Sequence, residues 1–120
     1  MKRTVAPNVG DIYSAELPYM KHVQSGRRPV IVAQNDKGNL FSPTIHVIPL
    51  TKQMRKANSQ PTHVMILADE HNKLKSNSVA LVEDMTPVPV ECLMTHIGKI
   101  GENDIQKLKK AFKIQFPFAG

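Results

Sequence analysis

Short apolar segments, separated by polar and turn-forming residues, dominate the first two thirds of the chain. Residues 11–17 alternate loosely between apolar and polar side chains and end at Pro18, as is typical of a strand. Residues 29–33 and 44–50 are rich in β-branched side chains, and the turn-forming residues 34–39 lie between them. This pattern predicts a β-hairpin.

The remainder of the chain adds two strands and then changes period. Residues 63–67 and 78–82 are short apolar runs between polar connections, and both are predicted to be strands. From Glu102 to Gln115 the apolar side chains follow the spacing of an amphipathic helix, which Pro117 ends. Closely spaced strands followed by one helix predict a mainly β fold, a small barrel or sandwich with a C-terminal α-helix.

The composition fits a single domain over residues 1–120, with 41% hydrophobic and 22% charged residues. No run approaches the roughly 18 apolar residues that span a bilayer, and polar and turn-forming residues soon after Met1 argue against a secretory signal. The lone Cys92 cannot form an internal disulfide, in agreement with a reducing compartment. We therefore expect a soluble, cytoplasmic protein without a membrane partner.

The charge balance points to a polyanionic partner. Lysine and arginine number 16 against 10 acidic residues, which gives a formal net charge of +6. Aromatic residues make up 5% of the chain and Trp is absent, so any nucleic-acid recognition would use hydrogen bonds and charge more than base stacking. The lysines of the C-terminal helix are interpreted first as a solvated face.

The histidines, the cysteine and the turn residues have structural interpretations. No paired metal-ligand spacing links His46, His63, His71, His96 and Cys92, so we predict no zinc site. His63 is expected to lie in a strand with its ring nitrogens bonded locally. Asp36 and Asn39 are interpreted as turn residues, supported by Gly38.

Several longer motifs follow one another along the chain. They are Gly10-Asp11-Ile12-Tyr13, Gly26-Arg27-Arg28-Pro29, Gln34-Asn35-Asp36, Gly38-Asn39, Phe41-Ser42-Pro43-Thr44, Pro61-Thr62-His63-Val64, Ser78-Val79-Ala80-Leu81-Val82-Glu83 and Ile97-Gly98. In these motifs the chain closely resembles the MazF/PemK family of toxin endoribonucleases, over nearly its whole length. The resemblance implies an SH3-like small β-barrel with an appended helix.

The same resemblance implies a function. Those toxins work as homodimers, cut single-stranded RNA such as mRNA at short sequences without a metal or other cofactor, and are silenced by a cognate antitoxin. DNA binding is implied only through the antitoxin complex. Two alternatives stay open: a non-enzymatic toxin of the same fold that acts on DNA gyrase, and a catalytically inactive RNA-binding relative. Val23 and Thr86 keep the second open, because relatives commonly carry an acidic residue and an arginine there.

The family pattern implies two catalytic residues, Arg28 before the Pro of the second strand and Thr51 at the end of the third. In this reaction the substrate's 2′-hydroxyl attacks the adjacent phosphorus and leaves 2′,3′-cyclic phosphate and 5′-hydroxyl ends. The protein must therefore stabilise a charged transition state. The planar guanidinium of Arg28 suits that role, and Thr51 can donate to a phosphate oxygen. Without the resemblance, a turn-capping hydroxyl would explain Thr51 equally well.

Two residues are candidates for the general base. Glu83 aligns with an acidic position near the active site of related toxins and follows an apolar strand, so we expect burial to raise its pKa, with Asp84 on the opposite side of that strand. His22 lies in the first long loop, where an imidazole suits proton transfer, although a solvated histidine is equally consistent. The expected RNA contacts are polar loop residues, namely Gln24, Arg27, Lys52, Gln53, Arg55 and Lys56.

Overall fold

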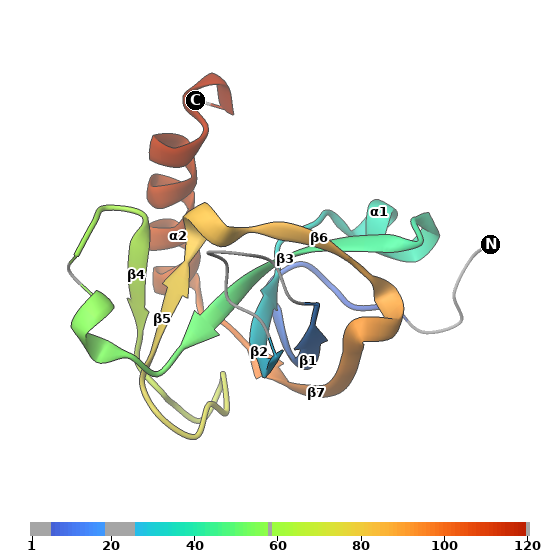
Figure 1. Cartoon of the computed structure of the whole chain (residues 1–120), viewed down its shortest axis with the longest axis horizontal. Helices are drawn as coiled ribbons and strands as arrows, with labels where there is room; N and C mark the ends of the chain where they lie inside the picture. The colour runs from blue at the N-terminus through green and yellow to red at the C-terminus, as the bar shows by residue number, and fades with distance from the viewer. Residues whose placement is uncertain (1–5, 19–25, 58, 120) are drawn as a thin grey trace.

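The computed structural model describes residues 6–18, 26–57 and 59–119, and most of its regular structure is strand (Figure 1). The strands are β1 (Asp11–Leu17), β2 (Gly26–Val32), β3 (Thr44–Thr51), β4 (His63–Ile66), β5 (Ser78–Leu81), β6 (Thr86–Pro89) and β7 (Leu93–Lys99). The helices are α1 (Asp36–Phe41) and α2 (Glu102–Gln115). Single 3₁₀ turns form η1 (Met54–Lys56), η2 (Val82–Asp84), η3 (Val90–Cys92) and η4 (Pro117–Ala119).

Strand β3 organises the sheet, because it pairs with three other strands. The strand order is β4-β5-β3-β2-β1-β7, with β6 also paired to β3, and all pairs are antiparallel. The first half of β3 pairs with β6, and Leu50 and Thr51 at its end pair with β5. The strands curl around β3 into an open, barrel-like sheet, which α2 follows. This confirms the predicted mainly β fold with a C-terminal helix.

Both faces of the second half of β2 are covered, which explains why residues 30–32 form a continuous apolar run. Ile31 packs with Ile48 in the core beneath α2, whereas Val30 and Val32 pack with Val47 in a second core. Because successive strand side chains point to opposite faces, a strand buried on both sides needs apolar residues throughout. The predicted hairpin of β2 and β3 is confirmed.

Helix α2 has the predicted bounds and buries the expected stripe. Leu108 and Ala111 are buried, and Ile105 and Phe112 pack beside them against the first core. The helix contacts β4 and η2, and Figure 1 shows it on the β4–β5 side of the molecule. No helix in the described part of the chain is long and apolar enough to cross a membrane.

The segment predicted as a turn between β2 and β3 instead contains α1. The Asn35 side chain accepts a hydrogen bond from the Gly38 N–H at 2.8 Å and caps the first turn of this helix. Asn39 is fully buried, and its side-chain amide donates to the Gln34 carbonyl. The Asp36 carboxylate accepts from the backbone N–H of Val9, which precedes β1. The turn interpretation of Asp36 and Asn39 was therefore wrong, because residues that favour turns also cap helices.

Strands β6 and β7 were not predicted. Pro87 and Pro89 are exposed in β6, while Val88 between them is buried opposite Ile45 of β3. Strand β7 pairs with β1 across two register irregularities, so its side chains do not alternate cleanly. Neither strand has the β-branched alternation by which the other strands were predicted.

Candidate active site

A groove of about 730 Å³ lies at the ends of β2 and β3, and we name it the basic groove. Its described lining residues are Ser14, Arg27, Arg28, Pro29, Leu50, Thr51, Lys52, Gln53, Lys73, Leu74, Lys75, Ser76, Ser78, Thr95 and Ile97. Every charged residue in this lining is a lysine or an arginine. The groove is therefore complementary to an extended anion.

Arg28 and Thr51 lie next to each other in this groove. The β2–β3 register pairs Val30 with Pro49, and the same register two residues further places Arg28 opposite Thr51. The Arg28 Nη1 atom donates to the Leu50 carbonyl oxygen at 3.3 Å, and burial lowers the pKa of the guanidinium. The structure thus brings together the two residues that the family pattern singled out.

The Thr51 side chain is buried, with its hydroxyl oxygen accepting the Gln53 N–H at 3.3 Å. This bond uses a lone pair of the hydroxyl and leaves its O–H to donate. The arrangement presents a guanidinium and a hydroxyl within one anion-binding groove.

The expected RNA contacts divide into two groups. Arg27, Lys52 and Gln53 line the basic groove. Arg55 and Lys56 lie in η1 outside the lining, where Arg55 Nη2 donates to the Gln53 side-chain oxygen at 3.2 Å. The expected site residues His22 and Gln24, together with Val23, lie outside the described residues.

Six polar lining residues were missed by the analysis of the sequence, among them Ser14 of β1 and Thr95 of β7. Lys73, Lys75, Ser76 and Ser78 reach the groove from the β4–β5 connection and the start of β5. In the sequence the first three of these positions belong to a polar connection, which is usually only solvated, and Ser78 begins a predicted strand. No local spacing relates them to Arg28, so folding alone brings them to the groove.

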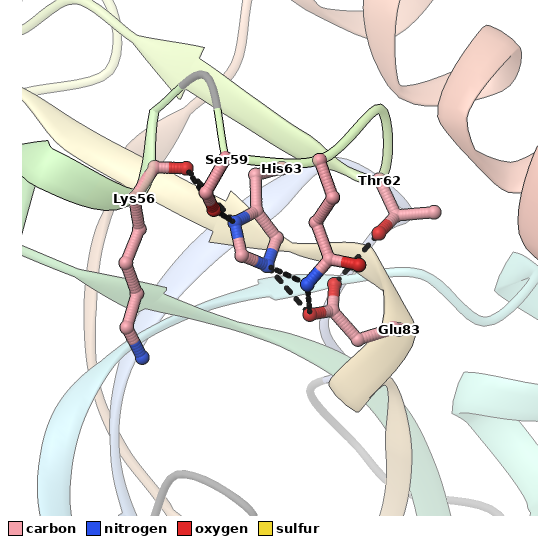
Figure 2. Close-up of polar contacts among 6 residues, drawn as sticks. Lys56, Ser59, Thr62, His63 and Glu83 are labelled. Atoms are coloured by element: carbon pink, nitrogen blue, oxygen red, sulfur yellow. Dashed lines mark hydrogen bonds and ion pairs between the residues drawn. The ribbon is translucent and has the colours of Figure 1, made fainter.

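Glu83 lies away from the groove, in a cluster that we name the His63–Glu83 network (Figure 2). Its carboxylate accepts hydrogen bonds from Thr62 Oγ1 at 3.0 Å and Gln60 Nε2 at 3.0 Å. The His63 Nε2 atom lies 2.5 Å from the same carboxylate. The expected general base is therefore held by three side chains from the β3–β4 connection and β4.

The other ring nitrogen of His63 fastens the β3–β4 connection. His63 Nδ1 lies 2.8 Å from the Lys56 carbonyl oxygen and 2.8 Å from Ser59 Oγ. The Lys56 carbonyl and the Glu83 carboxylate both accept, so donation to both requires a proton on each ring nitrogen. Figure 2 shows the Lys56 ammonium pointing away from the ring. The expectation that His63 is a strand residue with local partners is confirmed.

The expectation that burial raises the pKa of Glu83 was wrong. Burial alone acts in that direction, but hydrogen bonds from His63, the Glu83 backbone and Thr62, together with the charge on His63, outweigh it and lower the pKa. Glu83 and Asp84 also lie in η2 and not in a strand, so strand alternation does not separate their side chains. An ionised carboxylate with a lowered pKa is a poor proton acceptor.

The donor set of the groove is not that of a metal site. Its lining, as far as the described residues go, contains no carboxylate, imidazole or thiol. Across residues 6–18, 26–57 and 59–119, no three His, Cys, Asp or Glu side chains are grouped so that they could hold a metal ion.

Comparisons with known proteins agree with the geometry. Residues 8–116 match the family model described as PemK-like, MazF-like toxin of type II toxin-antitoxin system. The chain is 39% identical to endoribonuclease EndoA of Bacillus subtilis over 106 residues. This match covers 88% of this chain and 90% of that protein. The chain is 35% identical over 106 residues to endoribonuclease MazF of Staphylococcus saprophyticus, covering 88% of this chain and 87% of that one.

A solved structure has the same fold. It is described as an endoribonuclease in complex with its cognate antitoxin from mycobacterial species. The two structures superpose with a TM-score of 0.75 at 19% identity, over 93% of this chain and 96% of that chain.

Proposed function

The chain belongs to the family of PemK-like and MazF-like toxins of type II toxin-antitoxin systems, and from this premise we propose that it is an endoribonuclease that cuts single-stranded RNA such as mRNA. The observation that carries the proposal is the presence of Arg28 and Thr51 together in a groove whose charged lining is entirely cationic. Both named relatives over 88% of the chain are endoribonucleases, which supports RNA as the anion.

In the proposed reaction, the RNA supplies its own nucleophile. The 2′-oxygen bonds to phosphorus as its proton leaves, the bond to the 5′-oxygen breaks, and that oxygen takes up a proton. The products are a 2′,3′-cyclic phosphate and a 5′-hydroxyl. Arg28 stabilises the negative charge on the non-bridging phosphate oxygens through its planar pair of N–H groups, and Thr51 donates to a further phosphate oxygen.

We propose His22, and not Glu83, as the residue that accepts the proton of the 2′-hydroxyl. Glu83 is held within its own network, and its lowered pKa opposes proton uptake. An imidazole exchanges protons near neutral pH, which suits this step. Replacing His22 with Gln should lower kcat and flatten the pH profile of cleavage, whereas a profile identical to the wild type would contradict this role.

No metal or other cofactor is part of this mechanism. The proposed test incubates purified protein with a long RNA in the presence of EDTA and maps the ends of the fragments. We expect cleavage at a short recurring sequence, with cyclic phosphate and 5′-hydroxyl ends. A strict requirement for added magnesium would overturn the mechanism, and an intact RNA under all conditions would favour the catalytically inactive alternative.

The gyrase-poisoning alternative is not favoured. Both named relatives are endoribonucleases, and the cationic groove suits a nucleic-acid backbone better than a protein contact. Arg28 and Thr51 would have no evident role in a non-enzymatic poison.

We propose a cognate antitoxin as the protein partner, as in the mycobacterial complex. An acidic antitoxin segment would compete with RNA because carboxylates and phosphates use the same donors. Reversing the charges of Lys52, Arg55 and Lys56 should weaken the binding of both RNA and antitoxin. Both losses of affinity should shrink as the salt concentration increases. Simultaneous binding of RNA and antitoxin without competition would contradict the shared surface. DNA is then bound only through the antitoxin complex.

The active form is proposed to be a cytoplasmic homodimer, because two-fold assembly is the commonest closed symmetry and the implied arrangement in this family. Light scattering at micromolar concentration should give twice the 13.4 kDa of one chain. A mass that stays at 13.4 kDa would contradict the dimer.

A further inference from the structure

Lys73 has a backbone conformation that lysine rarely adopts. Its φ angle is 56°, and it is the one non-glycine residue with positive φ in the described part of the chain. In this left-handed region the Cβ atom crowds the following carbonyl, so glycine is the usual occupant. A lysine in a conformation where glycine would relieve strain makes its side chain a candidate for a functional role.

The loop around Lys73 is held by internal hydrogen bonds, so its conformation is well determined. Asn72 is fully buried, and its side-chain oxygen accepts from the backbone N–H groups of Asp69 and Leu74, each at 3.0 Å. The Asn72 amide donates to the Leu67 carbonyl at 2.8 Å. Lys73 therefore lies between two buried neighbours, Asn72 and Leu74, while its own side chain is exposed.

Strand β7 packs closely against the same loop. A Cβ atom on Gly98 would overlap the Asn72 carbonyl, so the two backbones approach as only a glycine allows. The Lys99 N–H donates to the His71 carbonyl at 3.3 Å. With one side of the loop held by β7, Lys73 lies in the lining of the basic groove.

The charged residues that line the groove together with Lys73 are all of one sign. Within the lining of the basic groove, Lys73 joins Arg27, Arg28, Lys52 and Lys75, and the described lining includes no acidic residue. The described residues provide no ion-pair partner for the Lys73 ammonium. Arg27 also lies 3.7 Å from the Glu16 carboxylate, but cations grouped in this way still repel one another, and a bound polyanion relieves that repulsion.

We propose that Lys73 is a substrate-binding residue, whose ammonium ion binds a backbone phosphate of the RNA while Arg28 acts at the scissile phosphate. This rests on the proposed endoribonuclease function. A phosphate contact positions the strand without reading its bases. Loss of Lys73 should thus change KM and not kcat, and should leave the cleavage sequence unaltered.

The decisive variant is Lys73→Gly, because it removes the charge and relieves the strained backbone together. We expect RNA affinity to fall about three- to tenfold and the slope of log affinity against log salt to shrink by about 0.7, with kcat unchanged. The melting temperature should stay at or above that of the wild type. Lys73→Gln should show the same binding loss, and Lys73→Arg should restore binding because it keeps the charge.

Lys99→Gly is the matched control. Lys99 is exposed in β7, outside the groove lining and without positive φ. There glycine should lower the melting temperature and leave RNA binding unchanged, the opposite of its effect at position 73. Lys73→Gly with wild-type KM and salt slope would overturn the inference, as would a binding loss that Lys73→Arg does not restore. Failure of the proposed function itself is distinguishable, because then the wild type would neither bind nor cut RNA.

Discussion

The basic groove and the His63–Glu83 network both gather polar side chains at strand ends, but they use their hydrogen-bonding groups differently. In the network the carboxylate, the imidazole and the neighbouring hydroxyls bond to one another. In the groove, Lys52, Lys73 and Lys75 form no ion pair with any described residue. Groups satisfied internally contribute to stability, whereas charges presented without counter-ions are available to a ligand.

This difference changes the roles expected of Glu83 and Lys73. Glu83 had the chemistry of a general base, yet its bonds place it among the stabilising contacts. Lys73 had no assigned role, yet it lines the same groove as Arg28. Changes in the groove should affect cleavage with little effect on stability, and changes in the network should do the reverse.

The largest effect is expected for Arg28→Ala. Removing a donor to the transition-state charge should lower kcat about 100-fold or more while the protein stays folded. Single-turnover cleavage and the melting temperature measure the two effects. The matched control is Arg55→Ala, since Arg55 lies outside the groove lining and should change cleavage only a few-fold. Wild-type cleavage by Arg28→Ala would remove this residue from the site and end the contrast between the two regions.

A smaller loss is expected for Thr51→Val, which keeps the side-chain shape and removes the hydroxyl. The loss of one hydrogen bond to a charged oxygen should slow cleavage about tenfold. Thr44→Val is the control, because Thr44 is exposed at the other end of the same strand. If both variants cleave at the same rate, the Thr51 hydroxyl has no part in the reaction.

Glu83→Gln should act on stability and not on cleavage. Replacing the ionised partner of His63 should lower the free energy of unfolding by about 1 kcal/mol at neutral pH, with kcat close to the wild type. Urea denaturation measures this change, and the exposed Glu91→Gln should shift it by less than about 0.5 kcal/mol. A large fall in kcat without loss of stability would return Glu83 to the catalytic machinery.

The stability difference between wild type and Glu83→Gln should also depend on pH. The pKa of Glu83 is lower in the folded protein than its ordinary value of 4.5, so the unfolded chain binds this proton first as the pH falls. The contribution of Glu83 is complete above pH 4.5 and is lost as the pH falls through the lower, folded value. A difference that instead grew on acidification would contradict the observed network.

The smallest effect is expected for Lys52→Gln. Loss of one phosphate contact should weaken RNA binding about threefold and reduce the salt slope by about 0.7. Lys110→Gln on the exposed surface of α2 removes the same charge away from the groove and should leave both values unchanged. Equal losses in the two variants would indicate that total charge, and not the groove, attracts RNA.

The fold was predictable wherever one local pattern decided it. Helix α2 was predicted at its observed bounds because its apolar spacing and the following Pro117 act within a few turns. Strands β6 and β7 were not predicted, because their apolar and polar residues do not alternate regularly. Prolines interrupt the pattern in β6, and register irregularities interrupt it in β7. Helix α1 was missed because helix caps and turns use the same residue types. The composition of this segment therefore could not show which of the two it forms.

The candidate site was predictable only in part. Arg28 stands in a recognisable motif, the family pattern added Thr51 at the end of the third strand, and the hairpin of β2 and β3 was predicted from their apolar runs. The direction of the pKa shift of Glu83 was predicted wrongly. The prediction considered burial beside a strand and omitted His63, which reaches the carboxylate from β4. Lys73 and Lys75 could not be assigned, because a charged loop looks the same in sequence whether solvated or folded over a groove.

By itself, the sequence determined the strand-rich fold, the closing helix and the cationic balance, because each depends on periodicity or composition, and the family resemblance singled out Arg28 and Thr51. Only the tertiary structure decided that Lys73 joins Arg28 and that Glu83 joins His63. Those contacts depend on how β5 and β4 pair and how β7 packs against the β4–β5 loop. Long-range packing therefore decided that Lys73 lines the groove and that Glu83 bonds within the network, which no local sequence pattern could show.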